Sequence, residues 1–177
     1  MTVPTSKRKT APCEFVNQAR IVMRETQKLM RKWPKSRQIT EVQFVLKTAY
    51  YVFEKAVWAN TIYCVVPSEF AARLSLLQEA YGKINCLASF CDDWLDDIPT
   101  VRNKRENVEH GGDFYVPVVS EKRLVNYVGT LSHAISIFAG AIKSTRTKLK
   151  DSLEKYPNYQ LTLPIVDAEL LSTGTSS

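Results

Sequence analysis

The sequence predicts an all-α protein, an antiparallel up-down-up-down four-helix bundle with a long loop between the third and fourth helices. Four helix-length segments have apolar residues at alternating spacings of three and four, and none of them alternates with the period of two that a half-buried strand requires. The longest polar faces of these segments are basic. Such spacing puts one apolar stripe on each helix, and four stripes can bury one another around a shared core.

The first helix is expected at about residues 11–33, after a flexible basic N-terminus at residues 1–10. Pro12 fits the first turn of a helix, where its missing N–H costs little, and Pro34 directly after Trp33 is expected to end the helix. Its stripe is Phe15, Ala19, Val22, Thr26, Leu29 and Trp33. Thr26 is the only polar residue in the four predicted stripes.

The second and third helices are expected at about residues 40–64 and 68–97. For the third, Pro67 is a turn residue, Ser68 a capping serine and Glu69 an acid at the positive end of the helix dipole, while Pro99 is expected to stop it. The second stripe is Val42, Val45, Ala49, Val52, Ala56, Ala59 and Tyr63, and the third is Phe70, Leu74, Leu77, Tyr81, Ile84, Ala88, Cys91 and Leu95.

The fourth helix is expected at about residues 120–155, with the stripe Leu124, Val128, Leu131, Ile135, Phe138 and Ile142. The predicted loop at residues 98–119 contains two adjacent glycines and a proline, and it is longer than most connections between helices, which marks it as a candidate functional or disordered loop. The helical pattern ends near residue 156, and residues 157–177 are expected to form a C-terminal tail.

Length and composition favour one domain. A chain of 177 residues with 45% hydrophobic content can bury one core and is short for two. The basic N-terminus has no apolar segment behind it, and no apolar run approaches the roughly 20 residues that span a bilayer, so a cytoplasmic protein without membrane contact is expected. The four cysteines, which are Cys13, Cys64, Cys86 and Cys91, form no CxxC pair and are expected to be reduced thiols.

The basic residues are unevenly distributed. The net charge is +6, and positive charge is concentrated in residues 1–60 and 101–150, whereas the remaining segments are net negative. Any one of these cations is most simply a solubilising charge, but together, with few acids between them, they indicate a phosphate-binding surface. The candidate nucleic-acid-binding residues are Arg20, Arg24, Lys28, Arg31, Lys35, Arg37, Lys143, Arg146, Lys148 and Lys150.

Metal-dependent catalysis is not indicated. The acidic cluster Asp92, Asp93, Asp96 and Asp97 contains the DDxxD pattern that binds magnesium in terpenoid synthases, but the chain is about half the length of such an enzyme and has no second acidic motif. We therefore expect an acidic surface patch. Neither His110 nor His133 follows a glutamate by three residues, which excludes the di-iron bundle pattern. No cofactor, metal or small-molecule substrate is expected.

One enzymatic pattern stays open as an alternative. Arg105 and His110 form an R-x4-H motif, which resembles the ribonuclease motif of HEPN domains, themselves helical bundles. In that family the two side chains act together on the scissile phosphate of RNA. A second alternative is a homo-oligomeric scaffold whose basic face binds an acidic protein.

The order of the helices, and the sequences of residues 36–60, 68–90 and 119–145, resemble the accessory variability determinant proteins of diversity-generating retroelements, which are similar to the rRNA intervening-sequence four-helix bundle proteins. The resemblance covers roughly residues 15–148 and lies in helix layout and scattered positions. Its best local match is the last helix, where Ser120, Lys122 and Gly129 are followed by the small residues and Ile-Lys-Ser ending at 139–144.

The resemblance implies a non-catalytic homo-oligomer, a pentameric barrel of bundles, that binds a structured template RNA and a reverse transcriptase and supports mutagenic cDNA synthesis. It places the phosphate contacts on the basic residues of the first helix and of the end of the fourth. Gly140 would allow helices to approach closely within or between subunits. The aromatic side chains of Tyr50, Tyr51 and Trp58, left over after the core stripe is filled, suit a subunit or partner interface, and a wider core that absorbs them is the alternative.

Overall fold

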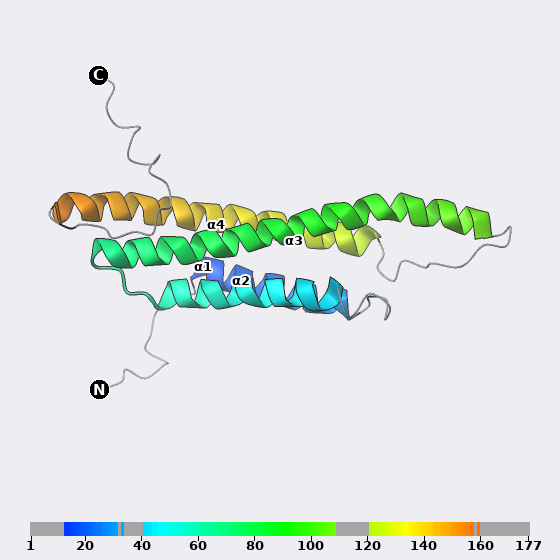
Figure 1. Cartoon of the computed structure of the whole chain (residues 1–177), viewed down its shortest axis with the longest axis horizontal. Coiled ribbons are helices and arrows are strands. Elements are labelled where there is room, and N and C mark those ends of the chain that lie inside the picture. Colours follow the sequence, from blue (N-terminus) through cyan, green and yellow to red (C-terminus); the bar gives the residue numbers. More distant parts are fainter. Residues whose placement is uncertain (1–12, 32, 34–40, 109–120, 158, 160–177) are drawn as a thin grey trace, which may run out of the picture.

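The protein has four helices, seen in a computed structural model that describes residues 13–31, 33, 41–108, 121–157 and 159 (Figure 1). They are α1 (Glu14–Met30), α2 (Gln43–Thr61), α3 (Pro67–Val108) and α4 (Glu121–Lys155). No residue in these described ranges belongs to a strand. The all-α class predicted from the apolar spacing is confirmed.

The helices pack around one apolar core. α1 contacts α2 and α4, and α3 contacts the same two helices. In Figure 1 all four axes lie along the long dimension of the molecule, and the C-terminal part of α3 runs on beyond the other three helices. A single cluster of buried side chains joins residues of all four helices, from Phe15 in α1 to Ile142 in α4.

The stripes of α1 and α2 are buried largely where the sequence places them. The buried members are Phe15, Ala19, Val22, Thr26 and Leu29 in α1, and Val45, Ala49, Val52, Ala56 and Ala59 in α2. Tyr63 differs, because α2 ends at Thr61 and leaves this side chain 83% exposed in the linker to α3. The five buried residues on this face of α2 are all alanines or valines, and they allow α2 to lie close to its neighbours, since small side chains shorten the distance between helix axes.

In α3 and α4, every second residue of the predicted stripe is only half-buried, and the residue just before it in the sequence is buried instead. In α4 the buried residues between Leu124, Leu131 and Phe138 are Tyr127 and Ala134, whereas the predicted Val128 and Ile135 are only half-buried. In α3 the corresponding buried residues are Ala80, Leu87 and Trp94, with Tyr81, Ala88 and Leu95 half-buried beside them. Adjacent residues on a helix are roughly 100° apart, so either choice preserves the three-and-four spacing.

The N-terminus of α3 is capped by Glu69. Its carboxylate accepts hydrogen bonds from the backbone N–H groups of Val65 at 2.6 Å and Val66 at 3.0 Å, and these bonds hold the pKa of Glu69 below its ordinary value. Pro67 is the first helical residue, as predicted. The predicted capping role of Ser68 is wrong, because its hydroxyl instead accepts a hydrogen bond from the hydroxyl of Tyr159 at 2.7 Å.

The predicted end of the third helix is also wrong. α3 continues through Pro99 to Val108, so residues 98–108 of the predicted loop are helical, and residues 109–119 lie outside the described part of the chain. Proline removes one backbone N–H and bends a helix rather than always ending it. α1 and α2 are each shorter at both ends than the predicted helices at 11–33 and 40–64. α4 agrees with the predicted helix at 120–155 to within about one residue.

α4 differs from the expectation that no segment is apolar enough to span a membrane. Among the described residues it is the one helix whose length and composition would permit crossing a bilayer. Of the apolar window in α4, 22% is buried inside the structure, and the buried residues belong to the stripe that packs against the neighbouring helices.

Candidate nucleic-acid interface

The basic residues of α1 form an exposed row on one side of the helix. Arg20, Arg24, Lys28 and Arg31 are all exposed. Their spacings of four, four and three place them within an arc of roughly 80° on the helix surface. We call these four residues the basic row. Opposite the row lies the buried stripe that begins at Phe15, so the amphipathic pattern of α1 turns its cations outward.

Little negative charge offsets the basic row. Lys28 forms an ion pair with Glu25 at 2.6 Å, and 68% of the Lys28 side chain remains exposed. The Arg20 guanidinium lies over the ring of Phe53 in α2, 5.8 Å from its centroid, which holds the charge at the surface. Within the described part of the chain, Arg20, Arg24 and Arg31 make no ion pair. Lys35 and Arg37 lie outside the described residues.

The predicted basic residues of α4 lie away from this row. Phe15, at the start of α1, contacts Phe138 with ring centroids 5.9 Å apart, whereas Thr26, farther along α1, is hydrogen-bonded to Tyr127. The two helices therefore run in opposite directions. Phe138 lies beside the start of α1, so residues 143–150 of α4 lie beyond the N-terminal end of α1. Lys143, Lys148 and Lys150 are exposed and Arg146 is half-buried. Their charges form a separate group at the other end of the α1–α4 pair.

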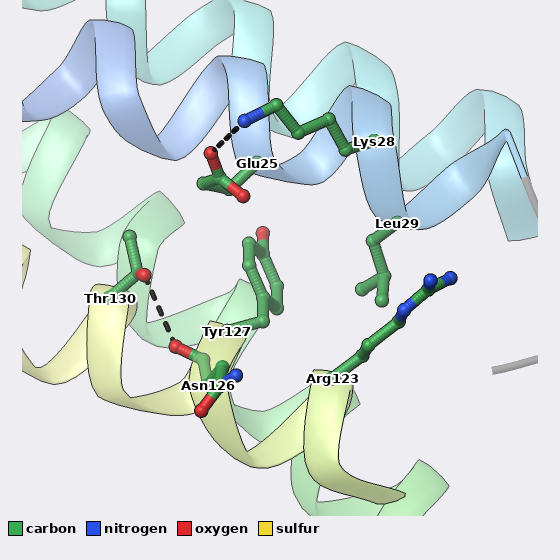
Figure 2. A pocket seen from close by; sticks show the side chains of 7 residues that line it. All are labelled: Glu25, Lys28, Leu29, Arg123, Asn126, Tyr127 and Thr130. Atoms are coloured by element: carbon green, nitrogen blue, oxygen red, sulfur yellow. Dashed lines mark hydrogen bonds and ion pairs between the residues drawn. The ribbon is translucent and has the colours of Figure 1, made fainter. Parts of the chain in front are cut away.

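Arg123 is a cation beside the basic row that was not among the sequence-based candidates. It is exposed in the first turn of α4, and it lines a cavity of about 340 Å³ between α1 and α4 together with Lys28 (Figure 2). The full lining is Glu25, Lys28, Leu29, Arg123, Asn126, Tyr127 and Thr130, and we call it the α1–α4 cavity. In the sequence, the adjacent cations Lys122 and Arg123 at the start of the fourth helix could have indicated this site. The packing of α4 against α1, which brings Arg123 next to Lys28, could not be predicted from the sequence.

Hydrogen bonds fix one side of this cavity. Figure 2 shows the ring of Tyr127 rising from α4 toward α1. Thr26 donates to the carbonyl oxygen of Val22 at 2.7 Å, and its oxygen lies 2.5 Å from that of Tyr127. Because a threonine hydroxyl has one proton, Tyr127 is the donor in the second bond. Burial raises the pKa of Tyr127 well above its ordinary value, so the phenol stays protonated.

The remaining polar groups of the cavity are arranged along α4. Thr130 donates its hydroxyl proton to the backbone carbonyl of Asn126 at 3.2 Å, and the Gln18 side chain reaches the Thr130 carbonyl at 3.5 Å. Within the described part of the molecule, the side-chain amide of Asn126 makes no hydrogen bond. The cavity thus has free donors on Arg123 and Asn126, and free acceptor capacity on Thr130 and Glu25.

The predicted interface residues lie at or near the surface. Tyr50 and Trp58 are 49% and 50% exposed. Tyr51 is half-buried, because its hydroxyl donates to Glu79 at 2.5 Å and the Lys55 ammonium lies 4.9 Å from its ring centroid. A Cβ added at Gly140 would meet no atom within 4 Å. Among the described residues, Gly140 therefore allows no close helix approach within the subunit, and a role between subunits stays a prediction.

The other candidate residues are placed as follows. Asp92 and Asp93 are exposed, and their partners Asp96 and Asp97 have no described side chains. Arg105 belongs to the helical backbone of α3. His110 lies outside the described ranges, so the relative position of the two R-x4-H residues stays untested. His133 is exposed on α4. None of the four cysteines is in a disulfide, and Cys91 is buried, which raises its pKa to about 12.

Metal binding has no donor set among the residues that the structure describes, because no three His, Cys, Asp or Glu side chains there converge. Comparison of the chain with protein-family models, curated proteins and solved structures finds no match.

Proposed function

We propose that this chain is a non-catalytic, cytoplasmic, homo-oligomeric protein that binds structured RNA and a reverse transcriptase, and that it supports mutagenic cDNA synthesis in a retroelement. The observation that carries the RNA-binding part is the basic row on α1, four exposed cations with a single paired acid beside them. The reverse transcriptase and the pentameric state come from the resemblance in sequence.

The basic row suits a phosphate backbone rather than a particular base sequence. From Arg20 to Arg31 the helix rises about 16 Å, so the row extends past several consecutive phosphates. Cations that contact phosphates release condensed counterions, and this release makes binding strong at low salt and weak at high salt. No helix-turn-helix, RRM or KH pattern accompanies the row, and the proposal therefore includes no base-specific contact.

We infer that the four helices form an antiparallel up-down-up-down bundle. Opposite pairing of α1 and α4 supports this topology, as do two contacts between α2 and α3, in which Phe44 meets Phe90 and Lys55 meets Glu79. In an oligomer of such bundles, the exposed Tyr50 and Trp58 on α2 and the open surface at Gly140 would form subunit contacts.

The RNA-binding part is tested by comparing two doubly substituted chains of equal charge. The first is Arg20→Gln with Arg24→Gln, in the basic row, and the control is Lys47→Gln with Lys155→Gln, two exposed cations elsewhere. Affinity for a structured RNA is measured by fluorescence anisotropy over a range of salt concentrations. We expect the row variant to reduce the salt slope by about 1.4 to 1.8, since each phosphate contact contributes about 0.7 to 0.9.

The control pair is expected to leave the slope nearly unchanged. Equal losses in both variants would show that only net charge matters and would remove the basic row as the site. A wild-type chain that binds no RNA at low salt would end the proposal. Recovery of cleaved RNA, with cleavage lost in His110→Ala, would replace it by the HEPN-like ribonuclease.

A further inference from the structure

The α1–α4 cavity lies at the edge of the basic row, and Lys28 belongs to both. We propose that this cavity binds one phosphodiester-linked nucleotide of an RNA strand, with the phosphate at Arg123 and Asn126 and the sugar or base between α1 and α4. The inference rests on the proposed function, because it assumes that an RNA strand follows the basic row. At Lys28 that strand would leave the row, and one of its nucleotides would enter the cavity.

The charge of the cavity matches one phosphodiester. Its charged lining residues are Lys28, Arg123 and Glu25, and the charges of Lys28 and Glu25 cancel in their ion pair at 2.6 Å. This leaves the Arg123 guanidinium as the net positive charge. A phosphodiester carries a single negative charge, and a guanidinium can donate two parallel hydrogen bonds to its oxygens. Arg123 also lies in the first turn of α4, where the helix dipole favours an anion.

The hydrogen-bonding groups favour a nucleotide over a simple anion. The proton of Thr130 is used within α4, and that of Tyr127 is used by Thr26, so neither hydroxyl is free to donate to a ligand. The Thr130 oxygen and the second oxygen of the Glu25 carboxylate can still accept hydrogen bonds from a ligand. Ribose hydroxyls and base N–H groups supply such donors, whereas a phosphate diester alone supplies none.

Size and shape agree with one nucleotide. The cavity of about 340 Å³ is at the small end of ligand pockets, which range from roughly 300 to 1,000 Å³. Leu29 from α1 and the ring of Tyr127 from α4 provide apolar surface against which a sugar or base can pack, as Figure 2 shows. A helical duplex is too wide for this space, so the strand at this point must be single.

The test uses the full chain and three probes, which are the dinucleotide UpU, inorganic phosphate and a single-stranded RNA of about 20 nucleotides. Amide signals of the isotope-labelled protein are followed by NMR during titration. We expect UpU to shift signals in residues 25–29 and 123–130, and phosphate to shift them weakly. Arg123→Gln is expected to weaken UpU binding about tenfold, the usual effect of losing a charge-assisted hydrogen bond.

The matched control is Lys122→Gln, which removes the neighbouring exposed cation without touching the cavity lining. It should change UpU affinity less than about twofold, as expected for an exposed charge that makes no contact with the ligand. Both substitutions lie at the exposed start of α4, and removing a cation there is favourable for the helix dipole, so both variants should fold.

Each other outcome has a distinct meaning. RNA binding through the basic row, with UpU shifts absent or outside the cavity, overturns the cavity proposal and leaves the proposed function standing. Inorganic phosphate that binds as tightly as UpU at the same residues overturns the nucleotide assignment in favour of an anion site. UpU binding without binding of the longer RNA overturns the proposed function, and with it the role of the cavity on an RNA strand.

Discussion

Thr26 is a polar residue in the apolar stripe of α1, and its surroundings show why it is tolerated. Its side chain is fully buried, but the hydroxyl donates to Val22 within its own helix and accepts from Tyr127 of α4. A buried hydroxyl is costly only when it lacks partners. The bond also gives α4 a reason to turn Tyr127 inward, since the phenol then has an acceptor in the core.

We expect Thr26→Val to destabilise the protein by about 1–3 kcal/mol, because it leaves the Tyr127 hydroxyl buried without an acceptor. Tyr127→Phe should cost less, about 1 kcal/mol, because Thr26 keeps its bond to Val22. Urea unfolding of both single variants and of the double variant gives the coupling free energy between the two hydroxyls. The loss of unfolding free energy in the double variant should be smaller than the sum of the two single losses by about 1 kcal/mol. Strict additivity would mean that the two hydroxyls do not interact in solution.

Among the elements, α3 departs most from its sequence pattern. Its buried face follows Leu77, Ala80, Ile84, Leu87 and Cys91, and its helical backbone continues past Pro99. Trp94 is buried near the end of this face and packs on Trp33, with ring centroids 4.4 Å apart. Beyond these contacts the C-terminal part of α3 extends past the other helices (Figure 1), so none of the other three described helices lies alongside its end.

Pro99→Ala is expected to stabilise this extension. Proline cannot donate to the carbonyl of Leu95, and alanine restores that helical bond and removes the ring, an exchange worth up to about 3 kcal/mol in a helix interior. Amide hydrogen exchange at residues 96–108 should become slower. Exchange of core amides in α1 and α2 is the internal control and should not change. Faster exchange at residues 96–108 in the variant would contradict the continuous helix.

Taken as a whole, the molecule separates its surface chemistry by location. The basic row and Arg123 lie on α1 and the start of α4, a second group of cations lies at the end of α4, and exposed aromatic side chains lie on α2. Lys55 links the exposed Trp58 to the half-buried Tyr51, since its ammonium lies near both rings while it pairs with Glu79 at 2.7 Å. If the proposed function holds, this arrangement would leave the α2 surface available to a second copy while the basic row of α1 contacts RNA.

Light scattering after size-exclusion chromatography tests the oligomer. We expect a ring of about five subunits of 20.1 kDa, which gains mass with a structured RNA at low salt and loses it at high salt. Trp58→Glu should dissociate the ring, because it puts a charge into the proposed subunit contact, whereas the exposed Lys47→Gln should not. A monomer or dimer indifferent to RNA would contradict both the pentamer and the basic row.

Apolar spacing along the chain was enough to predict the helical class, the shared core positions such as Val22, Ala49, Leu77 and Leu131, and the outward-facing cations of α1. These depend on periodicity along one helix, which is a local property. The packed fold was needed to establish that Tyr127 rather than Val128 is buried, that Arg123 lies beside Lys28, and that residues 143–150 lie apart from the basic row. Those outcomes depend on how each helix is rotated and shifted against its neighbours, and packing between helices sets both.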